Sequence, residues 1–200
     1  LTALAEPNLP KWHGLFYSYD LSTGTPQVSS VKNVISQADN GNLAASLAAI
    51  IGAFNASGDP VKYGMAQQAK ALLSGMDWTR LVNTNVNQMY LALDVYSDGT
   101  VTPHGFPDGT PYYVDHMFNE MRLGIIFGIV QDEVNKSTWT SLSKDYTSYT
   151  IDDGISVATL KSGTGSMFQA FLPSIFLKES TWSPNGFGVA LKNFALIQDY

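Results

Sequence analysis

The chain has 200 residues, of which 44% are hydrophobic and 14% charged, and its formal net charge is −6. This balance excludes a disordered chain, and 11 scattered basic residues argue against binding to nucleic acid, which needs clustered Lys and Arg. The sequence contains no cysteine, which excludes disulfides and thiolate metal ligands.

The composition favours a polar, uncharged ligand as the partner of this protein. Aromatic residues make up 12% of the chain, which fits a ligand with flat apolar faces, such as a sugar. His13, His104 and His116 lack metal-ligand spacing, so we predict no metal and no cofactor. No run of about 18 apolar residues occurs, so we predict no membrane partner.

The first half of the chain predicts loops followed by two helices. Residues 1–38 indicate loop with short extended pieces. Asp39 is predicted to cap a helix over residues 40–54, which has no polar face and should be buried on all sides. Asp59-Pro60 is typical of a helix start, and this second helix should end near Gly75.

The second half predicts a hairpin and then mostly helices. Tyr96-Ser-Asp-Gly99 indicates a hairpin turn. Apolar runs predict helices over residues 114–131, 137–144 and 165–177, with possible short strands between 146 and 164. Pro184 could open a last helix that reaches Tyr200. We therefore expect an all-α fold with a small β-hairpin, in which residues 1–200 form a single domain.

Glu120 is the first candidate for chemistry, because a carboxylate on an apolar helix is uncommon. Helical spacing would place His116 one turn before it. The helix N-terminus would favour the charged form of Glu120, whereas burial would raise its pKa. If burial prevails, Glu120 is a proton donor near neutral pH, as a glycosidase acid requires. The alternative is a contact of Glu120 with Arg122 or His116 that only ties the helix together. Asp39 could likewise bind a ligand hydroxyl or serve only as a helix cap.

Four stretches resemble a known family. They are Gly14-Leu-Phe-Tyr-Ser-Tyr-Asp20, Ala38-Asp-Asn-Gly-Asn-Leu-Ala-Ala45, Asn119-Glu-Met-Arg-Leu123 and Ser162-Gly-Thr-Gly-Ser-Met-Phe-Gln-Ala-Phe-Leu-Pro173. In this order they resemble the glycoamylase-like helical domain of endo-β-1,2-glucanases and of cyclic β-1,2-glucan synthases. The resemblance covers about residues 12–200.

The resemblance implies a glycoside hydrolase that cleaves β-1,2-glucan endo-wise with inversion on an (α/α)6 toroid. Glu120 would be the general acid. The substrate cleft would be lined by Asp39, Tyr19, His116, Arg122 and Gln169, the last standing where many relatives have Glu. The family's domain is much longer, so this chain would be its N-terminal half. A further segment or a second chain would complete the toroid and supply the general base.

Two other functions fit the same residues. One is a polysaccharide lyase, which the scarcity of basic residues disfavours, and the other is a non-catalytic carbohydrate-binding protein. The sequons Asn55-Ala-Ser57 and Asn135-Lys-Ser137 are consistent with a glycoprotein, and we expect a secreted or periplasmic location.

Overall fold

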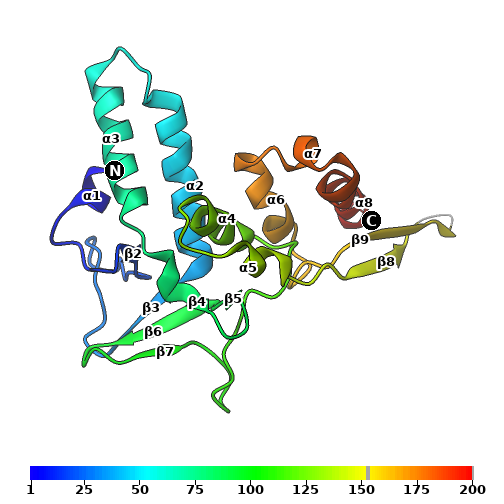
Figure 1. The fold of residues 1–200 in the computed structure, drawn as a ribbon, viewed down its shortest axis with the longest axis horizontal. Coiled ribbons are helices and arrows are strands. Elements are labelled where there is room, and N and C mark those ends of the chain that lie inside the picture. Colours follow the sequence, from blue (N-terminus) through cyan, green and yellow to red (C-terminus); the bar gives the residue numbers. More distant parts are fainter. Residues whose placement is uncertain (152–153, 200) are drawn as a thin grey trace.

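The computed structural model describes residues 1–151 and 154–199, which form a mixed arrangement of helices and small sheets (Figure 1). The helices are α1 (Thr2–Ala5), α2 (Gln37–Phe54), α3 (Pro60–Ser74), the 3-10 helix η1 (Trp78–Leu81), α4 (Arg122–Val130), α5 (Lys136–Thr140), α6 (Met167–Phe176), α7 (Glu179–Trp182), the π-helical turn η3 (Pro184–Gly188) and α8 (Val189–Gln198). The strands are β1 (Lys11–Trp12), β2 (Leu15–Phe16), β3 (Lys32–Ser36), β4 (Val82–Asn83), β5 (Gln88–Met89), β6 (Ala92–Tyr96), β7 (Val101–Pro103), β8 (Tyr146–Thr150) and β9 (Ser156–Leu160).

The predicted all-α fold is wrong. About 43% of the chain is helical and 20% is strand, so the protein is mixed α/β and not part of an all-α (α/α)6 toroid. The described residues form four antiparallel sheets, namely β1–β2, β3–β6–β7, β4–β5 and β8–β9. Strand β3 pairs with β6, about sixty residues later, with Ile35 opposite Leu93. A partner so distant is not visible in a local pattern, so the sequence predicts only short extended pieces within residues 1–38 and not a sheet.

Local capping signals agree well with the helices of the first half. Asp59 accepts hydrogen bonds from the backbone N–H groups of Val61 and Lys62, and α3 ends at Gly75, as predicted. Helix α2 differs, because Ser36 is its N-cap and accepts from the N–H of Asp39. Asp39 therefore lies in the first turn, where its carboxylate is not used as the cap. The predicted turn at residues 96–99 joins β6 to β7, with Gly99 at a φ of 87°.

The helix predicted over residues 114–131 is helical only from Arg122 onward. The preceding residues are held by other segments: the N–H of Val114 donates to Met89, and His116 forms a parallel bridge with Ser143. Glu120 therefore lies in a turn immediately before α4 and not on its surface. Pro184 likewise begins η3, which leads into α8, and Tyr200 lies outside the described residues.

Buried hydrophobic residues form two clusters. The larger includes Leu15, Ile35 and Trp78 and lies among α2, α4 and the three-stranded sheet. The smaller contains Phe118 and Phe194 and joins β9, α6 and α8. In Figure 1, α2 and α3 stand side by side on one side of α4, and α6, α7 and α8 gather on the other. The turn with Glu120 thus lies between the two parts of the core.

Helices α2 and α4 meet at two glycines. A Cβ atom at Gly41 would lie 2.7 Å from the backbone nitrogen of Gly124, and one at Gly124 would lie 2.4 Å from Nε2 of Gln37. Real Cβ atoms do not approach backbone so closely, so Gly41 needs glycine, whereas a side chain at position 124 would have to displace the buried side chain of Gln37. The contact brings the first turn of α2 against the start of α4. The prediction that α2 is buried on all sides is wrong, since its Ser46, Ala49 and Gly52 are exposed.

We expect Gly41→Ala to lower the free energy of unfolding by about 1–3 kcal/mol, because the new methyl group overpacks against backbone that cannot move aside. Gly52→Ala on the same helix is the matched control, since nothing lies within 4 Å of its Cβ position. That change should stabilise by about 0.5–1 kcal/mol through helix propensity. Urea unfolding of the two variants measures both values, and equal effects would contradict the close packing.

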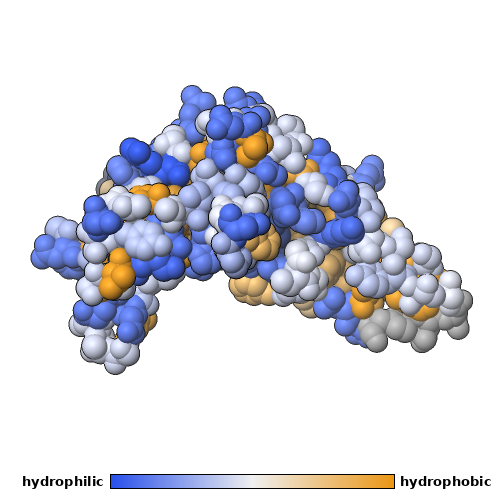
Figure 2. Space-filling model, turned by 90° about the horizontal axis from the view of Figure 1, so that it is seen from below, coloured by the Kyte–Doolittle hydropathy of each residue, from blue (hydrophilic) through white to orange (hydrophobic). Residues whose placement is uncertain are grey.

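The surface is mainly polar. Figure 2 shows polar residues over most of one face and scattered groups of hydrophobic residues, one of them at its hollowed lower edge. No helix among residues 1–151 and 154–199 is both long and apolar enough to cross a membrane.

Candidate active site

Glu120 is half-buried in the turn that leads into α4. Its Oε2 atom is buried and has no hydrogen-bond partner in the protein. Buried carboxylate oxygens normally have such a partner, because desolvation without one is costly. The salt bridges and hydrogen bonds of the described residues join Glu120 to neither Arg122 nor His116 through its side chain. The structure therefore does not support the reading that Glu120 only ties the helix together.

The pKa of Glu120 is raised from its ordinary value, first by burial and second by the negative charge of Asp39. Both effects disfavour the ionised carboxylate. A carboxyl group that retains its proton to a higher pH is suited to donate that proton. This is the property of Glu120 that the sequence predicted, although its position outside a helix was not foreseen.

Asp39 acts on Glu120 through its negative charge, and it lies in the first turn of α2, which packs on the start of α4. Its side chain is exposed. Gln37, two residues earlier, is fully buried, and its Nε2 donates a 2.8 Å hydrogen bond to the carbonyl oxygen of Met121. This bond holds the turn that carries Glu120 against the helix that carries Asp39. The two carboxylates are thus near enough for the charge of one to raise the pKa of the other, and a cleft shared by both stays a prediction.

His116 and the loop of residues 162–165 line one pocket of about 300 Å³. Nδ1 of His116 lies 2.6 Å from Oδ1 of Asp115. The carboxylate favours the tautomer with the proton on Nδ1, which leaves Nε2 as an acceptor. The resemblance implies a substrate cleft that contains His116, and this pocket brings His116 together with the loop that precedes Gln169. His116 is also close to Glu120 along the chain, since four residues span at most about 14 Å.

Gln169 shapes this loop. Its Oε1 accepts hydrogen bonds from the backbone nitrogen and the hydroxyl group of Thr164, at 3.1 and 2.9 Å. A glutamate at this position would accept the same two bonds with a full charge. The described contacts of Gln169 are with the loop that lines the pocket, and its role in substrate binding stays a prediction.

Arg122 does not reach the surface. It is fully buried, and its Nε and Nη2 atoms each lie 2.7 Å from a carboxylate oxygen of Glu179. Nη1 donates to the carbonyl of Asn119 at 2.6 Å and Nη2 to that of Ala170 at 2.9 Å. The side chain joins α4 to α6 and α7, so we leave it out of the proposed substrate site.

Tyr19 is half-buried near the N-terminal segments, and its hydroxyl group donates to the carbonyl of Pro10. Burial is the main cause of its raised pKa. No described contact joins Tyr19 to Glu120, Asp39 or His116, so the structure does not bring it into the same cluster.

Sequence reasoning missed three residues that support the site: Gln37, Asp115 and Glu179. The sequence offers an indication for Glu179: it is an acidic residue directly after an apolar helix, and Arg122 in its own apolar segment needs a partner of opposite charge. Asp115 had a weaker one, its position next to His116. Nothing in the sequence indicates that Gln37 is buried or that it binds the turn before α4.

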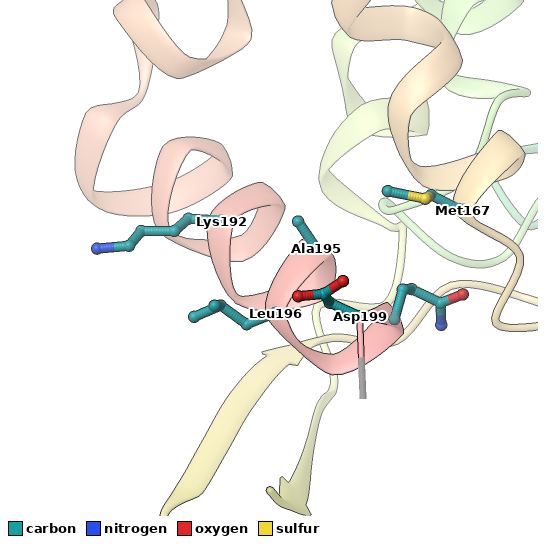
Figure 3. Close-up of a pocket in the computed structure, with 6 residues that line it drawn as sticks. Met167, Lys192, Ala195, Leu196 and Asp199 are labelled. Carbon is teal, nitrogen blue, oxygen red and sulfur yellow. The ribbon is translucent and has the colours of Figure 1, made fainter. Parts of the chain in front are cut away.

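Another hollow, of about 520 Å³, lies along α8 near the start of α6. Figure 3 shows Met167 facing Ala195 and Asp199 across it, with Lys192 directed away. It contains none of the predicted site residues. No group of three or more His, Cys, Asp or Glu side chains that could hold a metal ion occurs within 1–151 and 154–199.

No protein-family model and no curated protein matches the chain. The resemblance to endo-β-1,2-glucanases therefore stays a prediction that rests on the motif residues, and the all-α fold that it implied is corrected above.

Proposed function

We propose that this protein is a glycoside hydrolase that cleaves β-1,2-linked glucan within the chain and with inversion. The observation that carries the proposal is the half-buried Glu120, whose Oε2 lacks a partner and whose pKa burial and Asp39 both raise. The order of the motif residues supports the choice of glucan. The toroidal fold implied by the resemblance does not support this choice, because the protein is mixed α/β.

Glu120 acts as the general acid. Its carboxyl group donates a proton to the glycosidic oxygen as the bond from that oxygen to the anomeric carbon breaks. A water molecule attacks the opposite face of the same carbon and loses its proton to a second carboxylate, which the family resemblance places outside these 200 residues. Asp39 binds substrate hydroxyl groups and keeps Glu120 protonated. The pocket of His116 and residues 162–165 holds a further part of the chain.

The test is to incubate the complete protein with linear β-1,2-glucan and to follow reducing ends and the anomeric configuration by NMR. We expect internal cleavage with the α-anomer appearing first. Unsaturated products would indicate a polysaccharide lyase instead. Binding without turnover would indicate a non-catalytic carbohydrate-binding protein and would contradict the proposal.

The pH dependence should report the coupling of Glu120 to Asp39. Activity falls as the pH rises through the pKa of the acid, because the proton to be donated is then lost. Asp39→Asn removes the negative charge that raises this pKa, so we expect the alkaline limb of kcat/KM to move to lower pH. Asp59→Asn, which alters a distant helix cap, is the control and should leave that limb in place. An unchanged limb in Asp39→Asn would show that the two carboxylates do not interact.

A further inference from the structure

The hairpin of β8 and β9 supplies one wall of the pocket that His116 shares with residues 162–165. Thr147 and Tyr149, two residues apart on β8, both line it. Alternate residues of a strand point to the same face, so these two side chains face the pocket and Tyr146 faces the other way. Tyr146 indeed lines a different hollow, together with Met117 and Phe187. Tyr149 is 49% exposed, so its ring is open to a ligand.

The loop of residues 162–165 also lines the pocket and contains a hydrogen-bonding group that the fold does not use. Oγ of Ser162 is buried and has no partner in the protein. Gly165 has a φ of 75°, and its Cβ position is open, so nothing shields the backbone there. Thr164 is fixed by Gln169, which keeps the loop in one shape.

The remaining lining combines apolar and polar groups. Leu160 and Phe194 add apolar surface, while His116 offers Nε2 and Lys161 brings a single positive charge. A pocket of about 300 Å³ is at the small end of the range for ligand sites. One positively charged residue and several neutral residues line the pocket, and such a lining does not suit a strongly charged ligand.

We propose that this pocket is a sugar-binding subsite for one neutral hexose unit, with the ring of Tyr149 as the stacking platform. A hexose has apolar C–H faces and a rim of hydroxyl groups, which match the aromatic wall and the unpaired Ser162 hydroxyl. The short chain connection between His116 and Glu120 allows one oligosaccharide to occupy both places. The choice of a β-1,2-glucan as the ligand rests on the proposed function, but the site itself does not require catalysis.

The experiment is isothermal titration of the complete protein with linear β-1,2-gluco-oligosaccharides, in a Glu120→Gln background that prevents turnover. We expect Tyr149→Ala to weaken binding about tenfold, the loss of an aromatic stacking contact. Tyr146→Ala is the matched control, since it lies on the same strand and is similarly exposed, and it should change the Kd less than twofold. Phenylalanine at position 149 should restore binding, because the stacking ring is kept.

The outcomes separate the subsite from the proposed function. Hydrolysis by the unmodified protein with equal Kd values for Tyr149→Ala and Tyr146→Ala would overturn the subsite alone. Selective loss of binding in Tyr149→Ala without hydrolysis by the unmodified protein would support the subsite and overturn the hydrolase. Absence of both binding and hydrolysis would overturn both.

Discussion

Replacing Glu120 by glutamine should reduce the kcat for β-1,2-glucan hydrolysis by about 10²–10⁴-fold, the contribution expected of a general acid. Glutamine has the shape of the protonated carboxyl group but cannot give up a proton at the glycosidic oxygen. Substrate binding should persist, because the contacts of Asp39 and of the neighbouring pocket are not altered. Rates of reducing-end release at saturating glucan, compared with the unmodified protein, measure the effect.

Glu6→Gln is the control for this substitution, because Glu6 is an exposed carboxylate in the loop after α1. It should leave kcat unchanged. A Glu120→Gln protein with undiminished kcat would rule out Glu120 as the acid.

Stability gives an independent check on the environment of Glu120. Since the pKa of Glu120 is raised in the folded protein, protonation of its carboxyl group favours folding. This stabilisation is complete below the ordinary pKa of a glutamate and is lost as the pH rises through the raised pKa of the folded protein. Glu120→Gln should therefore match the unmodified protein at pH 4 and melt above it at pH 8. A higher Tm together with lost activity is typical of a residue retained for function.

The sequence predicts best where a short segment contains its own signals. Asp59-Pro60 determines the start of α3 because the cap and the first helical residue are adjacent, and Gly75 ends it. Residues 96–99 form their turn because Gly99 adopts a positive φ that other residues disfavour. These elements need no information from the rest of the chain.

The prediction fails where a distant segment decides the backbone. Residues 114–121 are predicted to be helical, but the carbonyl groups of Met89 and Ser143 accept the backbone N–H groups of Val114 and Met117, and the backbone follows bends and turns instead. Strand β3 depends on β6 in the same way. Strands β8 and β9 lie where the sequence predicts possible short strands, from their Thr, Tyr and Val residues, but no local signal shows that they form a wall of the pocket.

The sequence predicted only part of the candidate site, because it shows residue types and not the contacts between distant segments. The unusual carboxylate of Glu120 and the small residues around Gly41 are visible as residue types, and the structure joins them through the contact of α2 with α4. The role of Arg122 was not visible, because a charged side chain beside a candidate acid fits a cleft as well as a buried ion pair. Only its partner Glu179, fifty-seven residues away, distinguishes the two.

Removal of the buried positive charge of Arg122 should destabilise the protein strongly. Arg122→Met leaves the carboxylate of Glu179, which is 5% exposed, with only the hydroxyl of Ser174 at 2.7 Å. We expect the free energy of unfolding to fall by about 3–5 kcal/mol, as for other buried pairs from which one partner is removed. Urea unfolding measures the loss. The double change Arg122→Met with Glu179→Leu should recover much of it, because no unpaired charge remains.

The exposed ion pair of Arg80 and Asp77 provides the matched control, with a 3.0 Å contact between Nε of Arg80 and Oδ2 of Asp77 and side chains 47% and 32% exposed. Arg80→Met should cost less than about 1 kcal/mol, because water screens this pair. If Arg122→Met were as mild, and instead raised the KM for glucan, the guanidinium group would act on substrate, as the family resemblance implies. A large loss of stability in Arg122→Met, relieved in the double variant, assigns Arg122 to holding α4 against α6 and α7. Glu120 and Asp39 would then be the two residues with proposed roles in catalysis and substrate binding that remain beside α4.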